Sequence, residues 1–248
     1  MKHKRVIVTH YGGPDALQVI EEECPEPKKG EVRVNVLAAG VSLPDIMARE
    51  GIHPETPRVP YTPGWDLVGV VDRLGDGVTG VEPGQTIAAL PIHGAYAEFI
   101  CLPEDELVPV PVGLDPAEAV SLILNYVTAY QMLHRAAKVK PGQSVLIHGA
   151  AGGVGTALLQ LGRLAGVTMY GTCSARGASD VTEQQLKNRG GADDLRAEGV
   201  LRPADRVDDR CRLLHVAVLA DRREEVRRLQ KLILRNPGDA LHDFRRVA

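Results

Sequence analysis

The sequence predicts an α/β protein whose N-terminal part is rich in β-strands. Three observations favour this fold class. Short apolar and β-branched runs, separated by glycine and proline, occupy roughly the first 110 residues. A strand, a glycine-rich turn, a helix and a second strand then follow one another within about 30 residues, as in nucleotide-binding units. The last 65 residues differ in composition, with 13 arginines but only 4 of the chain's 26 glycines.

The length and composition are those of a globular protein. The chain has 248 residues, 44% of them hydrophobic and 25% charged, which gives room for one large domain or two small ones. The net charge of −3 gives no electrostatic reason to expect nucleic acid or an anionic membrane as a partner. The N-terminus lacks the apolar core of a signal peptide, and no apolar run is long enough to span a bilayer. We therefore expect a cytoplasmic protein. Four scattered cysteines without a CxxC pair argue against a disulfide scaffold and a clustered zinc site.

The N-terminal part predicts several short strands. They are expected at residues 5–9, 16–21, 31–38, 66–74, 86–90 and 95–102. Strands at this spacing predict a barrel or a sandwich. Asp115 followed by Pro116 is typical of a helix start, so a helix is expected at 117–123. A second helix is expected at 128–137.

A glycine-rich turn is the strongest functional motif. Residues 144–148 read as a strand, Gly149–Gly155 (GAAGGVG) follow, 156–165 have helical periodicity, and 167–172 read as a second strand. Glycines in this position let backbone N–H groups approach a diphosphate, and the helix N-terminus favours the anion. The alternative is a glycine-rich turn that only tightens an ordinary strand–helix unit. The predicted cofactor contacts are Ala151, Gly152, Gly153, Val154 and Gly155.

The residues after the second strand distinguish NAD from NADP. An acidic side chain there binds the 2′-hydroxyl of NAD, whereas basic or hydroxyl side chains accept the 2′-phosphate of NADP. This chain has Ser174 and Arg176, and the first acid is Asp180. We therefore predict NADPH as the cofactor, with Ser174 and Arg176 on the phosphate. The alternative is an ordinary polar loop.

Five longer motifs stand in a familiar order and spacing. They are AAGVSLPDIMAREG (38–51), PYTPGWDLVGVV (60–71), GDGVTGVEPGQTIAAL (75–90), GAYAEF (94–99) and GAAGGVGTALLQLGRLAG (149–166). With them, residues 1 to about 183 resemble the medium-chain dehydrogenase/reductase superfamily, and most of all its zinc-independent, quinone-oxidoreductase-like (zeta-crystallin-like) branch. The resemblance implies a GroES-like barrel (1–124), an incomplete Rossmann domain with a parallel sheet (125–183), and an active site between them. It also implies a homodimer, as in relatives.

The same resemblance predicts that no metal is bound. Zinc-dependent members carry a cysteine and a Gly-His-Glu sequence where this chain has Ser42 and Gly64-Trp65-Asp66. Tryptophan does not ligate zinc, and serine is a poor ligand beside a thiolate. His93 and His148, near the expected cleft, are the alternative ligands.

Without zinc, hydride transfer from NADPH suits a small-molecule acceptor that is already electrophilic, such as a quinone or an enone. The resemblance makes Ser42, Asp45 and Tyr126 the candidate catalytic residues and places Thr128 against the nicotinamide. The alternatives are a structural hydrogen bond for Asp45 and a bond from the Thr128 hydroxyl back to its own helix. Branch members often have asparagine at position 42 and a tyrosine near Ile46–Met47, and this chain has neither.

The resemblance ends near Glu183. Residues 184–248 are rich in Arg, Asp, Ala and Leu, as in a shifted reading frame or a splice to foreign sequence. Within them, 212–220 is apolar enough to be buried, and 221–234 predicts an amphipathic, partly docked helix. Because acidic residues are interspersed with the arginines, a nucleic-acid arm is not expected.

Two functional hypotheses follow. The first is an NADPH-dependent oxidoreductase impaired by its incomplete cofactor domain. The second is a catalytically inactive remnant that acts as a binding or partner module. A sheet of two strands with one helix leaves apolar faces uncovered and is only marginally stable by itself. Whether the rest of this sheet is present therefore separates the two hypotheses.

Overall fold

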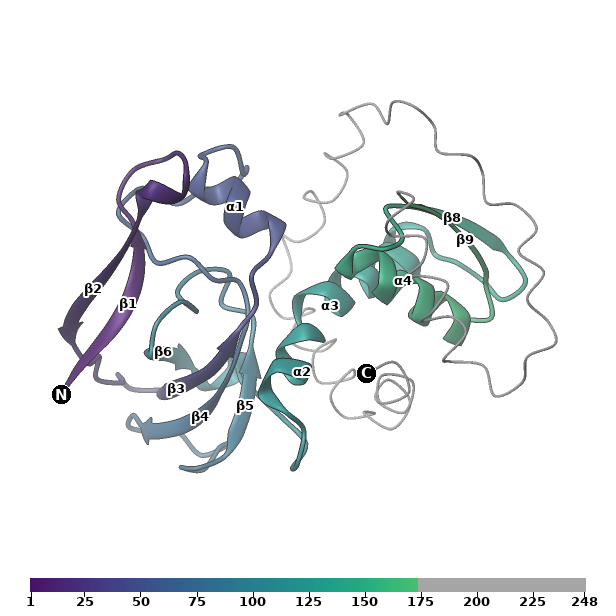
Figure 1. Ribbon diagram of the computed structural model, residues 1–248. Coiled ribbons are helices and arrows are strands. Elements are labelled where there is room, and N and C mark those ends of the chain that lie inside the picture. The colour runs from purple at the N-terminus through teal and green to yellow at the C-terminus, as the bar shows by residue number, and fades with distance from the viewer. Residues whose placement is uncertain (174–248) are drawn as a thin grey trace. The chain divides into compact units, whose positions relative to one another are not determined.

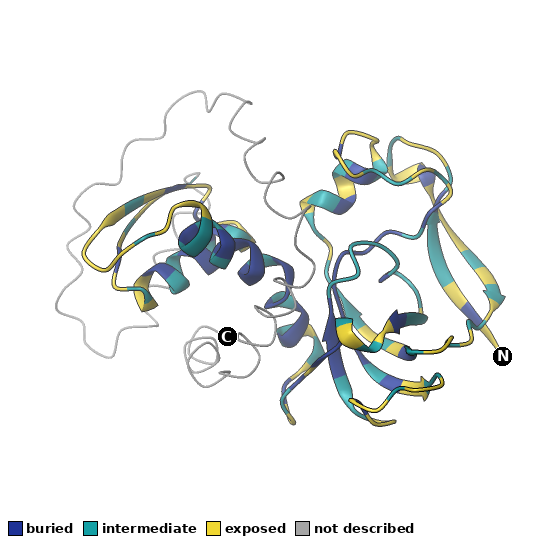
Figure 2. Ribbon diagram, turned by 180° about the vertical axis from the view of Figure 1, so that it is seen from behind, coloured by how far each residue is buried: buried dark blue, intermediate teal, exposed yellow. Residues whose placement is uncertain are grey.

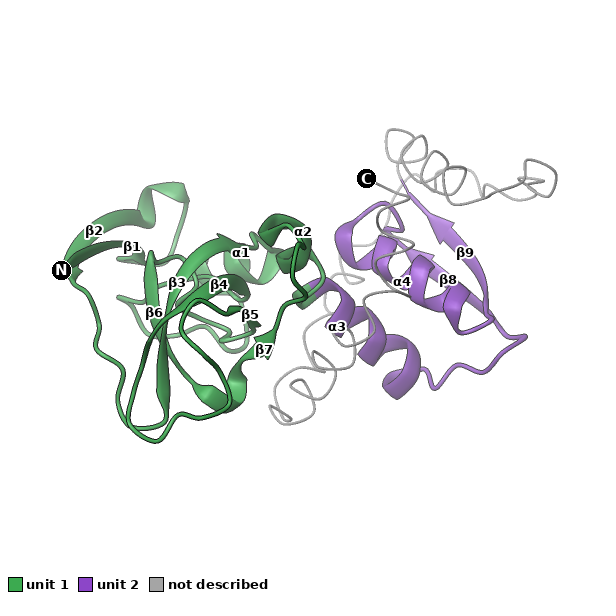
Figure 3. Cartoon of the chain, turned by 90° about the horizontal axis from the view of Figure 1, so that it is seen from below, with its two compact units in different colours: residues 1–124, 223–235 green, residues 125–222, 236–248 purple. Residues whose placement is uncertain are grey.

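The computed structural model describes residues 1–173, and these residues form two compact units (Figure 3). Unit 1 comprises residues 1–124, and unit 2 begins at residue 125. The predicted phosphate contacts Ser174 and Arg176 and the amphipathic helix at 221–234 lie outside the described residues. No helix within 1–173 combines the length and apolar character needed to cross a membrane.

Unit 1 is built mainly of antiparallel strands (Figure 1). A hairpin pairs β1 (Lys2–Val8) with β2 (Leu17–Glu23), and a short 3-10 turn at Pro14–Ala16 precedes β2. A five-stranded sheet has the order β6-β3-β4-β5-β7. Its strands are β3 (Glu31–Ala39), β4 (Leu67–Leu74), β5 (Thr86–Ala89), β6 (Phe99–Pro103) and β7 (Val108–Pro109).

One hydrophobic cluster of unit 1 lies on one face of this sheet. Val32, Val34, Leu67 and Ile87 are fully buried, and Val71 is nearly so; these are residues of β3, β4 and β5 (Figure 2). In β3, Val32 and Val34 are two residues apart and follow the alternation of apolar and polar residues that predicted the strand, although Arg33 between them is also buried. Burial of each of these branched side chains contributes a free energy of about 1.5–3 kcal/mol and stabilises the sheet.

Two short helices complete unit 1. The helix α2 (Pro116–Ser121) begins as predicted, because the Asp115 carboxylate accepts hydrogen bonds from the N–H groups of Ala117 (2.8 Å) and Glu118 (3.1 Å). The helix α1 (Leu43–Arg49) was not predicted. Its signal was a serine followed three residues later by an acid, with proline between them, which is a capping-box pattern.

Unit 2 contains a helix that is followed in the sequence by a strand–helix–strand unit. The helix α3 (Leu124–Tyr130) starts at the last residue of unit 1 and continues as a π-helical segment, Gln131–Ala136. The helix was predicted at 128–137, so it begins four residues earlier than expected. β8 (Ser144–His148), α4 (Gly153–Leu164) and β9 (Thr168–Thr172) follow, with the two strands parallel.

Within the described residues, one face of the β8–β9 sheet is covered and the other is not. A Cβ added at Gly162 of α4 would stand 2.2 Å from Sδ of Met169, so the helix packs closely on one face of β9. Leu146 and Tyr170 are paired in register, and their side chains point the other way. They are 50% and 49% exposed, respectively. Parallel sheets normally have both faces buried, so these two side chains mark an uncovered apolar face.

Candidate functional site

The glycine-rich turn leaves the end of β8 and leads into α4. Gly149 has a φ of 73°, a left-handed conformation in which glycine carries no steric penalty. Its N–H and that of Ala150 both donate to the carbonyl oxygen of Thr172, at 2.9 and 3.0 Å. Gly152 then donates to the Gly149 carbonyl oxygen at 3.0 Å. These bonds fix the turn against the end of β9.

The backbone of α4 approaches the backbone of the turn so closely that residue 155 must be glycine. A Cβ at Gly155 would lie 2.4 Å from the carbonyl oxygen of Gly149 and 2.7 Å from Cα of Ala150. A Cβ at Gly153 would lie 2.8 Å from Nδ2 of Asn125 in α3. Gly155 therefore lets α4 pack against the turn that precedes it, which is the role of the third glycine in dinucleotide-binding turns.

The start of α4 can accept an anion. Its N-cap is Gly152, which has no side chain, and no side-chain hydrogen bond caps the helix. The first N–H groups of a helix lack intrahelical partners, so those of Gly153, Val154 and Gly155 are available to a ligand. Residues 151–153 are exposed. The five predicted cofactor contacts thus follow one another from the exposed turn at 151–152 into the first residues of α4, of which Gly155 is buried, and a helix N-terminus of this kind fits a diphosphate.

A second polar feature lies beside this turn. Nδ1 of His148 and Oγ1 of Thr172 are 2.9 Å apart, at the carboxyl ends of β8 and β9. Ligands of open α/β sheets bind outside this edge. Sequence reasoning considered His148 only as a metal ligand, because the strand register that brings it to Thr172 is not visible in the spacing. Within residues 1–173, no cluster of three or more His, Cys, Asp or Glu side chains could hold a metal ion.

The predicted residues of α3 are buried. Tyr126 is 4% exposed, and its hydroxyl donates to Oε1 of Gln160, so it links α3 to α4. Thr128 is also buried, at 9% exposed. The observed contact of Tyr126 is between helices, and its catalytic role remains a prediction, as does the contact of Thr128 with the nicotinamide.

Ser42 and Asp45 organise the start of α1. Oδ2 of Asp45 accepts hydrogen bonds from the backbone N–H of Ser42 (2.9 Å) and from its Oγ (2.7 Å). Oδ1 of Asp45 accepts from the N–H of Gly64 at 2.9 Å. The buried carboxylate therefore joins α1 to the loop before β4. This contact is the structural hydrogen bond considered as the alternative for Asp45, and it leaves the proposed catalytic roles of both residues untested.

Asp66, which was not among the predicted site residues, has a buried carboxylate with a perturbed pKa. Asp66 is 4% exposed, and burial raises its pKa to about 6, with a further upward contribution from Asp45 and an opposing one from the hydrogen bond with the Leu124 N–H. Perturbed carboxylates are typical of functional sites. The sequence signal was an acid next to a tryptophan at a strand start, but burial of the carboxylate depends on residues far away in the chain.

Aromatic and histidine rings gather around Trp65. The Trp65 ring lies 5.2 Å from the His53 ring and 6.1 Å from the His93 ring, centroid to centroid, both in edge-to-face geometry. Burial lowers the pKa of both histidines. It also raises the pKa of Tyr61, whose ring contacts His93, to about 12. At neutral pH these rings therefore form an uncharged cluster in unit 1.

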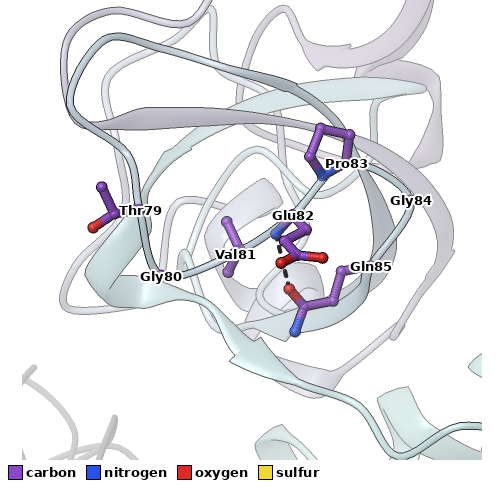
Figure 4. A pocket seen from close by; sticks show the side chains of 7 residues that line it. All are labelled: Thr79, Gly80, Val81, Glu82, Pro83, Gly84 and Gln85. Carbon is purple, nitrogen blue, oxygen red and sulfur yellow. Dashed lines mark hydrogen bonds between the residues drawn. The ribbon is translucent and has the colours of Figure 1, made fainter.

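A hollow of about 500 Å³ lies elsewhere in unit 1, along residues Thr79–Gln85 (Figure 4). Its polar groups bond to one another and to a neighbour. The Glu82 N–H donates to Oε1 of Gln85 at 3.0 Å, and the N–H groups of Thr79 and Gly80 donate to Oε1 of Glu104. These backbone N–H groups therefore already have acceptors within unit 1.

The comparisons with known proteins agree with this organisation. The family described as alcohol dehydrogenase GroES-like domain matches residues 28–112. The human synaptic vesicle membrane protein VAT-1 homolog-like is 37% identical over 172 residues, which cover 69% of this chain and 41% of that protein. Rat quinone oxidoreductase is 34% identical over 174 residues, which cover 69% of this chain and 53% of that protein. The chain thus spans about two fifths to one half of these relatives.

Solved structures show the same fold. The crystal structure of the human VAT-1 homolog-like protein matches with a TM-score of 0.71 at 35% identity, covering 74% of this chain and 60% of that one. Escherichia coli quinone oxidoreductase, solved in complex with NADPH, matches with a TM-score of 0.68 at 28% identity, covering 73% of this chain and 56% of that one. The predicted fold is confirmed: a GroES-like domain is followed by a partial Rossmann unit with a parallel sheet. Over about seven tenths of its length, the chain is thus similar to the quinone-oxidoreductase-like branch of the medium-chain dehydrogenase/reductase superfamily.

Proposed function

We propose that this chain carries the core of a zinc-independent, NADPH-dependent oxidoreductase that transfers hydride to a quinone or an enone. The observation that carries the proposal is the exposed glycine turn at the uncapped N-terminus of α4. Its free N–H groups and the backbone approach at Gly155 fit a dinucleotide diphosphate. The nicotinamide cofactor supplies hydride when bound.

In this proposal each part of the chain has a separate task. The backbone of 151–155 holds the diphosphate, and Ser174 and Arg176 bind the 2′-phosphate. Thr128 contacts the nicotinamide. Ser42, Asp45 and Tyr126 line the acceptor site, where the Asp45 carboxylate keeps the Ser42 hydroxyl oriented through their 2.7 Å hydrogen bond.

The cofactor assignment predicts a preference that one substitution removes. NADPH should bind more tightly than NADH, and Arg176→Ala should erase most of the difference. A charge-assisted contact to phosphate contributes about 1.5–3 kcal/mol, so the NADPH affinity should fall about ten-fold or more. Calorimetric titration of both cofactors measures this.

Two variants serve as controls for that titration. Arg163→Ala removes an exposed arginine from the last turn of α4 and should leave the preference unchanged. Gly155→Ala introduces a methyl group against the Gly149 carbonyl oxygen and should weaken both cofactors together. Equal affinity of the parent chain for NADPH and NADH would refute the assignment.

We also expect that the chain holds no stoichiometric zinc. Ser42 and Trp65 stand where zinc-dependent relatives have ligands, and Ser42 Oγ is already bonded to Asp45. Elemental analysis of protein purified without chelators checks this. About one tightly bound zinc per chain would show that the expectation is wrong.

A second candidate function is a catalytically inactive binding or partner module. The uncovered face at Leu146 and Tyr170 favours it, because an apolar sheet face of this kind is normally covered. Absence of dinucleotide binding in the parent chain, together with a folded unit 1, would favour this candidate.

A further inference from the structure

The carboxylate of Asp66 joins two segments that are far apart in sequence. Its Oδ2 accepts a hydrogen bond from the backbone N–H of Leu124 at 3.1 Å, across 58 residues of sequence. Its Oδ1 accepts from the N–H of Gly40 at 3.2 Å. A Cβ at Gly40 would stand only 2.3 Å from Oδ1, so the carboxylate is packed directly on this glycine.

Each of the two bonded residues precedes a part of the candidate site. Gly40 stands two residues before Ser42, whose hydroxyl and N–H bond to Asp45. Leu124 is the first residue of α3, the helix that carries Tyr126 and Thr128. The N–H groups of Leu122 and Ile123 still donate to carbonyl oxygens of α2, at 3.2 and 3.1 Å. At Leu124 the acceptor is the Asp66 carboxylate instead.

The two bonds are not equivalent. The Gly40 N–H also lies 3.3 Å from the backbone carbonyl oxygen of Asp66, so it keeps an acceptor if the carboxylate is removed. The Leu124 N–H lies at the start of a helix, where N–H groups lack intrahelical acceptors. Removal of the carboxylate should therefore affect Leu124 more than Gly40.

We propose that Asp66 is a positioning residue of the candidate site: its carboxylate holds Leu124 and so sets where α3, the helix bearing Thr128, begins. This inference rests on the proposed function for the role of Thr128. The contact between Asp66 and Leu124 is independent of it.

The surroundings of Asp66 give this contact a pH dependence. The titratable groups that face it within the described residues are Asp45 of α1 and Tyr96 of the segment before β6, and neither supplies a positive charge. Because burial raises the pKa of Asp66 from 3.8 to about 6, ionisation favours arrangements in which the carboxylate is hydrated. Opening at Leu124 should therefore become more frequent as the pH rises through about 6.

The experiment is backbone amide hydrogen exchange of the full chain between pH 4 and 8, corrected for intrinsic rates. In the parent, protection at Leu124 should fall as the pH rises, by about a hundred-fold at most, since the shift is roughly two pKa units. Asp66→Asn keeps an oxygen acceptor but cannot ionise, so its protection should not vary with pH. Asp66→Ala should leave Leu124 poorly protected throughout. Asp115→Asn, at the exposed cap of α2, is the matched control and should behave as the parent.

A binding measurement tests the link to the site. Asp66→Ala should weaken NADPH but not adenosine 2′,5′-bisphosphate, which has no nicotinamide to reach α3. Parent-like protection of Leu124 in Asp66→Ala, an unchanged pH dependence in Asp66→Asn, or equal weakening of both ligands would overturn the proposal. If the parent binds neither ligand, the proposed function fails, and the exchange at Leu124 still decides the role of Asp66.

Discussion

Replacing residues 184–248 with the second half of a complete family member is expected to raise turnover by orders of magnitude. The glycine turn is formed locally, since Gly149–Gly155 require only β8, α4 and the end of β9. The resemblance implies that the nicotinamide end needs later strands, which residues 184–248 do not resemble. Correct placement of reacting groups can contribute about 7–11 kcal/mol to catalysis. Steady-state NADPH oxidation with a simple quinone, on the parent and the chimera, measures the difference.

Deletion of residues 184–248 is the control for this experiment. We expect weak or undetectable turnover by the parent and little change after deletion. The chimera should also aggregate less, because added helices would cover the face at Leu146 and Tyr170, and added strands would pair the edge of the β8–β9 sheet that is open within the described residues. Robust turnover by the parent that disappears on deletion would show that these residues replace the missing half.

Substitution of Asp66 by asparagine is expected to change how stability depends on pH. The folded-state pKa of Asp66 is raised from 3.8 to about 6, so between these values the folded state binds more protons than the unfolded state. The free energy of unfolding contributed by this group therefore falls as the pH rises, and the loss is complete above about pH 6. A shift of roughly two units corresponds to about 3 kcal/mol. We therefore compare the free energy of unfolding of Asp66→Asn with that of the parent at each pH. The difference should shift in favour of the variant by about 2–3 kcal/mol between pH 4 and pH 7.5.

Trp65 provides the measurement. It is the chain's one tryptophan, it is 2% exposed, and it precedes Asp66 in unit 1. Urea unfolding followed by its fluorescence therefore reports on unit 1. Asp115→Asn should run parallel to the parent across the pH range, because Asp115 is exposed and asparagine is also a good N-cap. If the stability of the parent and that of Asp66→Asn depended on pH in the same way, the raised pKa of the buried Asp66 carboxylate would be contradicted.

Local signals predicted the secondary structure of most of the described chain. The alternation of polar and apolar residues placed β3, and the Asp115-Pro116 pair placed the start of α2. The strand at 144–148 was predicted with the observed bounds. α1 was missed because a seven-residue helix has little periodicity, although its capping pattern was present. α3 began earlier than predicted because its first residue bonds to Asp66, which sequence spacing does not reveal.

The sequence by itself determined most of the elements and the glycine-rich turn, because turn glycines, helix caps and strand alternation act between residues a few positions apart. Only the tertiary structure decided which distant groups meet. It brought Asp66 to Leu124, Asp45 to Gly64, and Tyr126 to Gln160, and it buried Asp66 enough to raise its pKa. The physical reason is that desolvation and hydrogen bonding depend on all neighbours in space, and chain folding brings these neighbours together over 19 to 58 residues of sequence.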